Sequence, residues 1–584
     1  MNLNINFLRF WFSAVCGSFL IISGSFAQQI YLDDDFRDWE TIPALHTDKS
    51  GDGGVSGIDF RSLKMSNSDE YLYIYLEVSK FINIQSSNSI TMFLDTDNQS
   101  ATGWNIYGIG AELSFNFGYR EGGYYSGSST VSVRHAAIGL VTAPTVTSDR
   151  FEIAIRRKFN VGGTETFLQN RIKIVFSNET VAGDRLPDNN EGIEYLFSDN
   201  GPDITLPYSI EKKDNRHVRL MAYNVERDNF FNLTVRDQYK RIFNAIQPDI
   251  IGFSEIYNNS SSATAALVEN LLPSSGGRQW YHAGVSPDIR LVSRYPIVDT
   301  RAINGNGAFL LNMGSWQMVC IVTHLPCCEN EISRQQEVDN IMAFIRDIRL
   351  GVSPFDVRQG TPVIITGDMN FVGFREQLQT MLTGDIANNS VYGPDFRPDW
   401  DESDLDDLSP FVTDAPFTYT WYNPAGSFSA GRLDYFIYTG SVLDIHNSFT
   451  LNTEVMQPEK RSAFGLLAGD TGPVSDHFPL VADFSLKGSI SGNIDAIPSD
   501  NDSVFWSVYP NPSANRMIKV VLQNAPVHPP EIQILSTEGK SVQKYTFPKG
   551  SAELSINGEN LIPGLYYFQL KSGKNIFKKA VYLN

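Results

Sequence analysis

Six short polar motifs occur in one order between residues 219 and 484, and each carries side chains that can bind a metal ion or move a proton. The motifs are YNVE (223–226), PDIIGFSE (248–255), THL (323–325), GDMN (367–370), RLDY (432–435) and SDHFP (475–479). Carboxylate oxygens are ligands that Mg²⁺ prefers, and neutral histidine is the usual general base near pH 7. Gathered in one cleft, these groups suit metal-assisted cleavage of a phosphoester.

Most of the motifs lie where an apolar run of strand length ends. Residues 250–253 precede Glu255, and residues 363–365 precede Asp368. Apolar residues that recur at spacings of three and four predict an amphipathic helix over residues 333–349. Strands that alternate with helices indicate an α/β layer structure. The polar side chains are therefore expected to gather at one end of a sheet.

The positions of these residues already suggest chemical roles. Glu255 directly follows an apolar run, so its carboxylate needs a cation to offset the loss of water. Asp368 and Asn370 are two residues apart and leave their strand on one face. They are expected to hold a water molecule or a leaving oxygen, together with a phosphoryl oxygen. Asp476 and His477 pair a carboxylate with an imidazole, and His477 is a candidate to activate or align water against phosphorus.

Together the six motifs resemble the endonuclease/exonuclease/phosphatase superfamily over about residues 217–485. The resemblance implies a central α/β four-layer sandwich, in which two β-sheets are flanked by helices. It also makes Glu255 the main ligand of Mg²⁺, with Mn²⁺ or Ca²⁺ as alternatives. Asn224 would help to bind the metal, together with Glu226 or Asp476. Many relatives carry Asp where this chain has Glu226, whose side chain is longer by one methylene. The alternative for Glu226 is a solvent-exposed strand residue.

The same resemblance implies catalytic roles. Asp434 of the RLDY motif would lie opposite His477, orient its ring and stabilise its charged form, while the general base is either Asp368 or His477. Apurinic-site endonucleases of the family usually have Tyr where this chain has His324, whereas deoxyribonuclease I, the sphingomyelinases and the inositol phosphatases have His. His324 could donate to a phosphate oxygen or protonate the leaving group. The alternative for His324 is a buried structural histidine.

The N-terminus has the composition of a signal peptide over residues 1–27. A basic residue precedes an apolar stretch over residues 10–22, and Ser25 and Ala27 offer small side chains before the expected cut. A membrane anchor is the alternative, but it needs about 20 apolar residues and this stretch is shorter. We therefore expect export, with the mature protein secreted or displayed on the outer cell surface. No later segment of the sequence is apolar enough to suggest a transmembrane span.

Residues 28–205 are predicted to form an all-β sandwich. Apolar residues at every second position from 71 to 78 alternate mainly with tyrosines, which places two apolar faces on one strand. Strands of this kind pack as a β-sandwich. The segments FLDTDN and TGW loosely resemble family 9 carbohydrate-binding modules, which implies a possible glycan partner. Asp95, Asp97 and Asn98 of the first segment could bind calcium, and a plain acidic turn is the alternative.

The C-terminal part is predicted to consist of a polar linker over residues 486–503 and a β-rich unit over residues 504–584. This unit begins with VYPNP (508–512), contains LIPGLYY (561–567) near its end and closes on several lysines. These features resemble the C-terminal sorting domain of the type IX secretion system. The resemblance implies an immunoglobulin-like β-sandwich and the secretion machinery as a partner. A small adhesion module is the alternative.

Two local features leave alternatives open. Removal of the signal peptide would leave Cys320, Cys327 and Cys328, and an odd count requires a free thiol or an intermolecular bond. The adjacent cysteines either form a disulfide that stiffens a loop beside the site or are two small loop residues. The acidic segment at residues 399–407 is interpreted as a solvated loop rather than a Ca²⁺ site.

Net charge narrows the function without identifying a substrate. The charge of −20 argues against a broad electrostatic grip on nucleic acid, but a metal ion can supply positive charge locally. The sequence predicts an exported, metal-dependent phosphoesterase and favours a phosphodiesterase or nuclease acting on extracellular nucleic acid. The alternatives are a sphingomyelinase-like or inositol-phosphate phosphoesterase, or a surface glycan-binding protein with a structural central domain. The oligomeric state does not follow from the sequence.

Overall fold

The chain divides into two compact units, Met1–Gly488 and Ser489–Asn584, in a computed structural model. The structure describes residues 28–127, 129–198, 205–275, 279–352, 355–488, 506–509, 517–522, 530–536, 540–558, 560–572 and 575–583. The predicted signal peptide at residues 1–27 lies outside the described residues, as do residues 489–503 of the predicted linker. No helix within the described ranges is long and apolar enough to cross a membrane.

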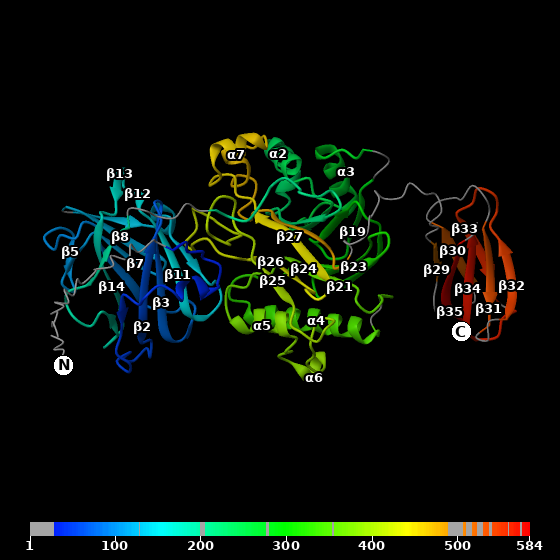
Figure 1. Cartoon of the computed structure of the whole chain (residues 1–584), viewed down its shortest axis with the longest axis horizontal. Helices are drawn as coiled ribbons and strands as arrows, with labels where there is room; N and C mark the ends of the chain where they lie inside the picture. The colour runs from blue at the N-terminus through cyan, green and yellow to red at the C-terminus, as the bar shows by residue number, and fades with distance from the viewer. Residues whose placement is uncertain are drawn as a thin grey trace, which may run out of the picture. The chain divides into compact units, whose positions relative to one another are not determined.

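Strands make up most of the N-terminal part of the first unit (Figure 1). The elements are β1 (His46–Thr47), β2 (Phe60–Asn67), β3 (Tyr71–Ile82), β4 (Ile90–Asp95), β5 (Trp104–Ile106), β6 (Ile109–Ala111), β7 (Leu113–Asn116), β8 (Glu121–Ser126), β9 (Ser129–Val133), β10 (Val141–Ala143), β11 (Ser148–Arg156), β12 (Lys158–Val161), β13 (Thr164–Phe167), β14 (Arg171–Asn178), β15 (Arg185–Leu186), β16 (Ile193–Leu196), η1 (Phe36–Trp39) and α1 (His135–Ile138).

These strands form two main sheets. A five-stranded sheet has the order β1-β2-β3-β11-β10, and a seven-stranded sheet has the order β15-β14-β4-β7-β8-β9 with β16 paired to β14. Two small ribbons pair β5 with β6 and β12 with β13. One hydrophobic cluster contains buried residues from both main sheets, so the two sheets share a core.

The central part of the first unit alternates strands with helices. Its elements are β17 (Val218–Asn224), η2 (Asn229–Phe231), η3 (Leu233–Val235), α2 (Arg236–Ile246), β18 (Ile250–Ser254), α3 (Ser261–Leu271), β19 (Tyr281–Gly284), β20 (Arg290–Ser293), β21 (Ile297–Ile303), β22 (Asn306–Asn312), β23 (Gln317–His324), α4 (Glu331–Leu350), β24 (Val363–Asp368), α5 (Arg375–Thr383), α6 (Asn389–Tyr392), β25 (Asp406–Leu408), β26 (Asp434–Tyr438), β27 (Leu443–Thr450), α7 (Pro458–Ala463), η4 (Ala468–Asp470) and β28 (Leu480–Leu486).

Two six-stranded sheets organise this central part. One has the order β19-β20-β18-β17-β28-β27, and the other has the order β21-β22-β23-β24-β26-β25. A hydrophobic cluster with residues from both sheets lies between them. Helices α2 and α3 pack on the first sheet and α4 and α5 pack on the second, and Figure 1 shows these helix pairs on opposite sides of the central strands.

Helix α4 confirms the amphipathic helix predicted over residues 333–349. Its buried residues include Val338, Ile341 and Ile345, which belong to the cluster beneath the second sheet. The helix ends at Gly351, whose φ of +69° is a left-handed conformation that glycine adopts without steric cost. The local apolar spacing therefore determined both the position and the buried face of this element.

Strand β3 joins the N-terminal sheets to the central part. Leu72 and Ile74 are fully buried in the core between the N-terminal sheets. Tyr71 and Tyr73 point to the other face, where they share a cluster with Phe417 of the central part. The prediction of two apolar faces on this strand is confirmed, because each face is covered by a different partner.

The second unit is β-rich, as predicted. Its elements are β29 (Trp506–Tyr509), β30 (Met517–Leu522), β31 (Glu531–Leu535), β32 (Ser541–Thr546), β33 (Glu553–Asn557), β34 (Gly564–Ser572) and β35 (Asn575–Leu583). They form a three-stranded sheet of order β29-β30-β33 and a four-stranded sheet of order β32-β31-β34-β35. Apolar residues of both sheets contribute to one buried cluster.

The acidic segment at residues 399–407 differs from the predicted solvated loop at its two ends. Asp399 is 1% exposed and accepts a hydrogen bond from the backbone N–H of Ser441 (2.9 Å). Asp407 lies in β25 and accepts a hydrogen bond from Nη1 of Arg432 (2.9 Å). The interpretation is wrong for these two residues, because distant donors allow Asp399 to be buried and Asp407 to be half-buried within a strand.

The cysteines are free thiols rather than a disulfide. Cys320 is buried, whereas Cys327 and Cys328 are exposed. The structure therefore favours the second alternative for the adjacent pair, two small residues in the loop that precedes α4.

Candidate active site

The candidate site residues lie at one end of the two central sheets, because the strands that carry them end or begin there. Asn224 is the last residue of β17, and Glu255 follows β18, which is parallel to β17. His324 and Asp368 end the parallel strands β23 and β24 and lie opposite each other in the ladder. Asp434 begins β26 and lies opposite Asp368. The structure thus brings these five residues to one end of the strands, as the sequence predicts.

The SDHFP loop is held at this end of the sheets by hydrogen bonds to neighbouring strands and loops. The hydroxyl of Ser475 donates to the carbonyl of Asn224 (2.8 Å) and accepts from the N–H of His477 (3.0 Å). The indole Nε1–H of Trp421 donates to Oδ2 of Asp476 (2.8 Å). These contacts fix the direction in which His477 projects from the loop.

The ring of His477 is buried between two carboxylates. Its Nδ1 lies 2.7 Å from Oδ2 of Asp434, and its Nε2 lies 3.5 Å from Oδ2 of Asp368. Burial of the ring alone would lower the pKa of His477, but the charges of Asp434 and Asp368 raise it to about 10. Burial raises the pKa of Asp368, and the charge of His477 opposes that increase. Asp368 and His477 are therefore a strongly interacting acid–base pair.

His324 has a similar arrangement on the other side of Asp368. Its Nδ1 lies 2.5 Å from Oδ2 of Asp288, and its Nε2 lies 3.7 Å from Oδ2 of Asp368 and 3.8 Å from Oε1 of Glu255. Burial would lower the pKa of His324, but the hydrogen bond to Asp288 and the charge of Asp368 raise it to about 9. The imidazole is therefore protonated near neutral pH and can donate to an anion.

Asn224 links the carboxylates of the two sheets. Its Nδ2 donates to Oε1 of Glu255 (3.1 Å) and to Oδ2 of Asp368 (3.0 Å), while its Oδ1 accepts from the backbone N–H of Glu226 (3.0 Å). The other oxygen of Glu255 accepts from the backbone N–H of Arg227 (2.9 Å). Two carboxylates that would otherwise repel each other are thus held on either side of one neutral amide.

Two residues of the site adopt a left-handed backbone conformation. Glu255 has a φ of +63° and Asn370 has a φ of +48°, and Glu226 at the rim has a φ of +44°, which is uncommon for residues other than glycine. Asn370 donates its Nδ2–H to the carbonyl of Leu325 (2.9 Å), and its backbone N–H donates to Oδ1 of Asp368 (3.0 Å). These bonds hold the turn after β24 so that the Asp368 carboxylate stays at the end of its strand.

Glu226 and Asp476 lie at the rim of the site. Glu226 is exposed as a whole residue, but its carboxyl group is partly shielded from water. That partial burial, together with the neighbouring charge of Asp476, raises the pKa of Glu226. Strand β17 ends at Asn224, so Glu226 belongs to a loop rather than to a strand. Asp476 is half-buried and points to Trp421 through one oxygen. The structure brings both residues near the site but gives neither a direct contact with Glu255.

The donors of this site fit a hard divalent cation. Glu255 and Asp368 both approach Nδ2 of Asn224, and Oδ1 of the same amide accepts from the N–H of Glu226, so Asn224 would have to turn its amide to offer an oxygen to a cation between the two carboxylates. Mg²⁺ typically binds to one or two carboxylates and completes its coordination with water and phosphate oxygens. No thiolate lies among these donors, which is the ligand that softer metals favour.

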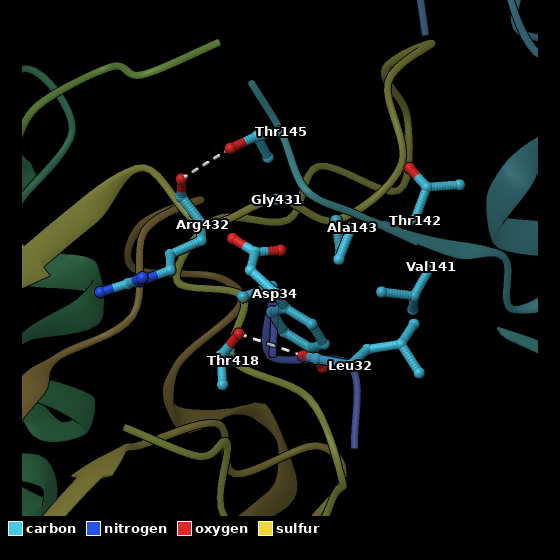
Figure 2. Close-up of a pocket in the computed structure, with 11 residues that line it drawn as sticks. Leu32, Asp34, Val141, Thr142, Ala143, Thr145, Thr418, Gly431 and Arg432 are labelled. Carbon is cyan, nitrogen blue, oxygen red and sulfur yellow. Dashed lines mark hydrogen bonds between the residues drawn. The ribbon is translucent and has the colours of Figure 1, made fainter. Parts of the chain in front are cut away.

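The RLDY motif is buried where the N-terminal strands meet the central part. Arg432 is 5% exposed, and Figure 2 shows it beside Asp34 in the lining of a small cavity. The hydroxyl of Thr145 donates to the carbonyl of Arg432 (3.2 Å). The N-terminal part therefore supports the turn that leads directly into Asp434.

Two residues of the site were not found by sequence reasoning. Asp288 binds His324 but belongs to none of the motifs. It ends a Ser-Pro-Asp segment, and one residue separates it from β20. Trp421 binds Asp476 from a long loop without regular strands or helices. An acidic residue directly before a strand next to the motif-bearing strands is the one signal that could have indicated Asp288.

Comparison with known families supports two parts of the chain. Residues 221–477 match the Endonuclease/Exonuclease/phosphatase family, and residues 507–583 match the Secretion system C-terminal sorting domain. The resemblances to these two families are thereby confirmed, and the resemblance of residues 28–205 to carbohydrate-binding modules stays a prediction. A search of curated proteins finds no match to the chain.

Several solved structures align with somewhat under half of this chain. The D. rerio TDP2 complexed with single strand DNA product has 12% identity and a TM-score of 0.30, and the alignment covers 46% of this chain and 100% of that chain. The human nocturnin catalytic domain with bound sulfate anion has 18% identity, a TM-score of 0.29 and coverages of 46% and 94%. A beta toxin from Staphylococcus aureus has 13% identity, a TM-score of 0.28 and coverages of 45% and 99%.

Proposed function

We propose that this chain, whose residues 221–477 belong to the Endonuclease/Exonuclease/phosphatase family, is an exported, divalent-metal-dependent phosphodiesterase that hydrolyses extracellular nucleic acid. One observation carries the proposal: two imidazoles, each bound to its own carboxylate, direct Nε2 toward Asp368. The Nε2 atoms of His477 and His324 lie 3.5 Å and 3.7 Å from its Oδ2. A phosphate bound beside Asp368 would therefore meet a proton-transfer group on either side.

Water activation is assigned to the pair formed by Asp368 and His477. Asp434 binds Nδ1 of His477 at 2.7 Å, which fixes the ring and leaves Nε2 free to exchange a proton. Because Asp368 lies within 3.5 Å of that Nε2 and the pKa of His477 is raised to about 10, the two groups titrate together, with the imidazole protonated near neutral pH and the Asp368 carboxylate as the member that accepts a proton. The pair would align water for in-line attack on phosphorus.

His324 is assigned to the developing negative charge. Asp288 keeps its ring protonated and oriented, so Nε2 can donate to a phosphoryl oxygen or to the leaving oxygen. Asn370 would hold the neighbouring phosphoryl oxygen once its amide exchanges the carbonyl of Leu325 for substrate.

Glu255 is the expected main ligand of Mg²⁺, with Asn224 and with Glu226 or Asp476, while Mn²⁺ or Ca²⁺ are the alternatives. When bound, the cation supplies local positive charge at the phosphoryl oxygens. This contribution is important in a chain with a net charge of −20, which has little other means of attracting a polyanion.

The C-terminal sorting domain indicates export through the type IX secretion system. The proposal adds a signal peptide at residues 1–27 and a mature protein that is secreted or displayed on the outer surface. It also includes the four-layer arrangement of residues 217–485 and the immunoglobulin-like form of residues 504–584. Glycan binding by residues 28–205 is proposed on the sequence resemblance alone, and retention on polysaccharide resins would test it.

The activity is tested with the purified mature protein and Mg²⁺, Mn²⁺ or Ca²⁺. The substrates are plasmid DNA, RNA, sphingomyelin, inositol phosphates and bis(p-nitrophenyl) phosphate. His477→Ala removes the imidazole of the proposed Asp368–His477 pair. His282→Ala is the matched control, because His282 is an exposed histidine on β19. We expect metal-dependent cleavage of nucleic acid that is lost in His477→Ala and kept in His282→Ala.

Other outcomes would change the conclusion. Preferential hydrolysis of sphingomyelin or inositol phosphates would keep the site and replace the substrate. Equal activity in His477→Ala and the wild type would reject the assigned chemistry. A lack of turnover on every substrate and metal would favour a surface binding protein with a structural central domain.

A further inference from the structure

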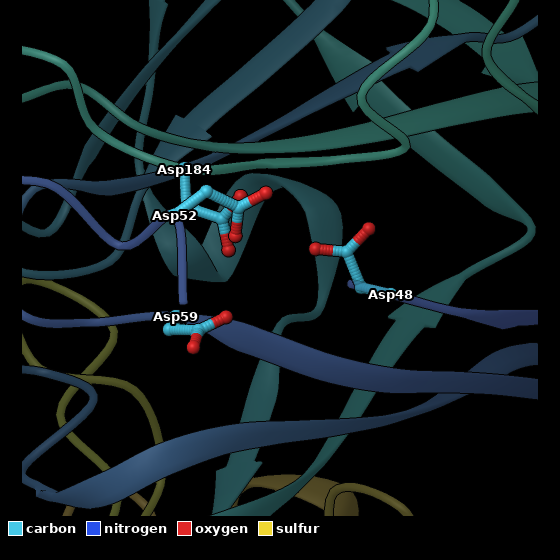
Figure 3. Close-up of side chains that lie close together, drawn as sticks. All are labelled: Asp48, Asp52, Asp59 and Asp184. Atoms are coloured by element: carbon cyan, nitrogen blue, oxygen red, sulfur yellow. The ribbon is translucent and has the colours of Figure 1, made fainter. Parts of the chain in front are cut away.

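A group of four aspartates lies in the N-terminal part, far along the chain from the motifs. Asp48, Asp52 and Asp59 come from the loop between β1 and β2, and Asp184 directly precedes β15. One carboxylate oxygen from each residue lies within 4.8 Å of the others. Figure 3 shows Asp52 and Asp184 next to each other, with Asp48 and Asp59 turned toward them.

The carboxyl groups of this cluster are largely shielded from water. Asp59 is 6% exposed and Asp184 is 3% exposed, while the side chain of Asp48 is only 2% exposed. Burial of four acidic groups is expensive unless they are paired or bind a cation. Burial raises the pKa of Asp48 to about 7 and that of Asp184 to about 6, and neighbouring carboxylates add to both shifts.

Hydrogen bonds satisfy only part of this group. Asp184 accepts from the backbone N–H groups of Phe60 (2.6 Å) and Arg185 (2.7 Å). By contrast, Oδ2 of Asp48, Oδ1 of Asp52 and Oδ1 of Asp59 are buried without a hydrogen-bond partner in the described structure. Unpartnered buried acceptors on three of these four neighbouring carboxylates favour a positive group among them.

The cations supplied by the protein do not balance the cluster. Nη2 of Arg61 lies 3.2 Å from Oδ2 of Asp59, and Nε2 of His46 lies 3.8 Å from Oδ1 of Asp48. In each contact the cation lies beside the other oxygen of the carboxylate, not the unpartnered one. The orphaned oxygens therefore remain available for an ion.

From these contacts we propose that Asp48, Asp52, Asp59 and Asp184 form a structural Ca²⁺ site, which we call the four-aspartate site. Ca²⁺ binds oxygen ligands at about 2.3–2.6 Å, so two ligands of one ion lie no more than about 5.2 Å apart. The observed limit of 4.8 Å satisfies that condition. Ca²⁺ accepts many carboxylate oxygens in flexible geometry, whereas Mg²⁺ demands a near-ideal octahedron and retains water.

The site would join the two main N-terminal sheets. Strand β2 belongs to the five-stranded sheet and β15 to the seven-stranded sheet, and the loop before β2 touches the loop before β15. A Cβ atom on Gly54 would lie 1.9 Å from the carbonyl oxygen of Ala182, so only glycine permits this close approach. An ion bound by both loops would stabilise the sandwich where these edge segments meet.

The proposal is independent of the phosphoesterase chemistry, so its test removes the catalytic cation first. Mature protein carrying Glu255→Gln is treated with EDTA, and its thermal unfolding is followed while CaCl₂ or MgCl₂ is added at equal ionic strength. We expect Ca²⁺ at about 100-fold above its Kd to raise the Tm by roughly 5–10 °C, and Mg²⁺ to have a much smaller effect.

Asp48→Asn distinguishes ion binding from a simple structural role. Because it removes a repelling charge, it should raise the Tm in EDTA and abolish the increase caused by Ca²⁺. Asp69→Asn, at an exposed position before β3, is the matched control and should keep the increase. If Asp48→Asn does not fold, Asp52→Asn, at the other half-buried position of this loop, is read in the same way. An unchanged Tm of the Glu255→Gln protein in Ca²⁺, or a full increase in the folded aspartate variant, would overturn the proposal.

Discussion

The active site and the four-aspartate site both gather carboxylates, but they balance the negative charge differently. In the active site, Asp434 and Asp288 each hold an imidazole, and Glu255 accepts hydrogen bonds from an amide and a backbone N–H. In the described active site one buried carboxylate oxygen, Oδ1 of Asp434, has no such donor, whereas in the four-aspartate site three have none. Preorganised donors can hold charged groups without an ion, whereas orphaned acceptors depend on one.

This difference separates two consequences of removing divalent cations. At the active site, we expect catalysis to stop while the hydrogen-bonded geometry remains. At the four-aspartate site, we expect the carboxylates to repel one another and the N-terminal sheets to lose stability. The following predictions examine how far each type of balance extends.

The largest effect is expected from Asp434→Asn. An amide in place of the carboxylate no longer stabilises a positively charged His477 and can impose the wrong tautomer on its ring. We expect kcat to fall by about 10²–10⁴-fold, measured by steady-state kinetics on the substrate that the wild type cleaves. Asp444→Asn, on β27, is the control. A loss below tenfold would mean that His477 functions without its carboxylate.

A smaller loss is expected from Asp288→Asn. Asp288 acts through His324, which it orients and keeps protonated, so its replacement should weaken transition-state stabilisation without removing a reacting group. We expect kcat/KM to fall by about 10–100-fold. Asp237→Asn, exposed on α2, is the control. If His324 instead serves only a structural purpose, Asp288→Asn should lower the Tm and leave kcat unchanged.

Asp288 also shows what local sequence could not reveal. Helix α4 and the ends of β18 and β24 follow from apolar spacing and from polar residues after apolar runs, which are signals within a few residues. The hydrogen bond between Asp288 and His324 joins residues 36 positions apart. It exists only because the loop before β20 meets the end of β23, a strand of the other sheet. Local patterns therefore predicted which end of the sheets carries the chemistry, but not which carboxylate orients His324.

The same limit applies to the N-terminal part. Alternation along β3 predicted that both of its faces are apolar, but the partner of the tyrosine face, which includes Phe417, lies over 300 residues away in the sequence. The four-aspartate site is similarly divided between the loop before β2 and the segment before β15. FLDTDN resembles a calcium motif because Asp95, Asp97 and Asn98 lie within four residues, whereas the four-aspartate cluster has no continuous signature.

A third carboxylate group tests whether hydrogen bonds can replace an ion in the N-terminal part. Glu152 is fully buried and accepts from Nε1–H of Trp39 (2.9 Å) and from the backbone N–H groups of Asp33 and Asp34. Burial raises the pKa of Glu152 well above its usual range and that of Asp33 to about 7, and the charges of these residues and of Asp38 contribute.

Raised pKa values make this part more stable at low pH. The folded protein binds more protons than the unfolded chain above about pH 4, so the contribution is complete below that pH and is lost as the pH rises through about 7. With Ca²⁺ saturating, we expect the Tm to fall by about 2–4 °C between pH 5 and pH 8. Glu152→Gln should flatten that dependence. A Tm that rises over this interval would contradict the assignment.

The smallest effect is expected at the second acidic group, formed by Asp95, Asp97 and Glu112. Its oxygens are mostly satisfied, because Asp97 accepts from Thr102 (3.0 Å) and Glu112 accepts from the backbone N–H of Thr96 (2.7 Å). Only Oε1 of Glu112 is a buried acceptor without a partner there, among the residues described. This group therefore fits the acidic turn that the sequence offered as an alternative to a calcium site.

Asp97→Asn should consequently change the Ca²⁺-induced increase in Tm by no more than about 1 °C, while Asp48→Asn abolishes it. The two variants remove the same charge from the same part of the molecule, so they differ chiefly in whether the lost carboxylate lies beside orphaned oxygens. Equal losses in both would mean that Ca²⁺ responds to the general acidity of these sheets. A loss confined to Asp48→Asn would tie the ion to the unpartnered acceptors, because hydrogen-bonded carboxylates nearby would have contributed nothing.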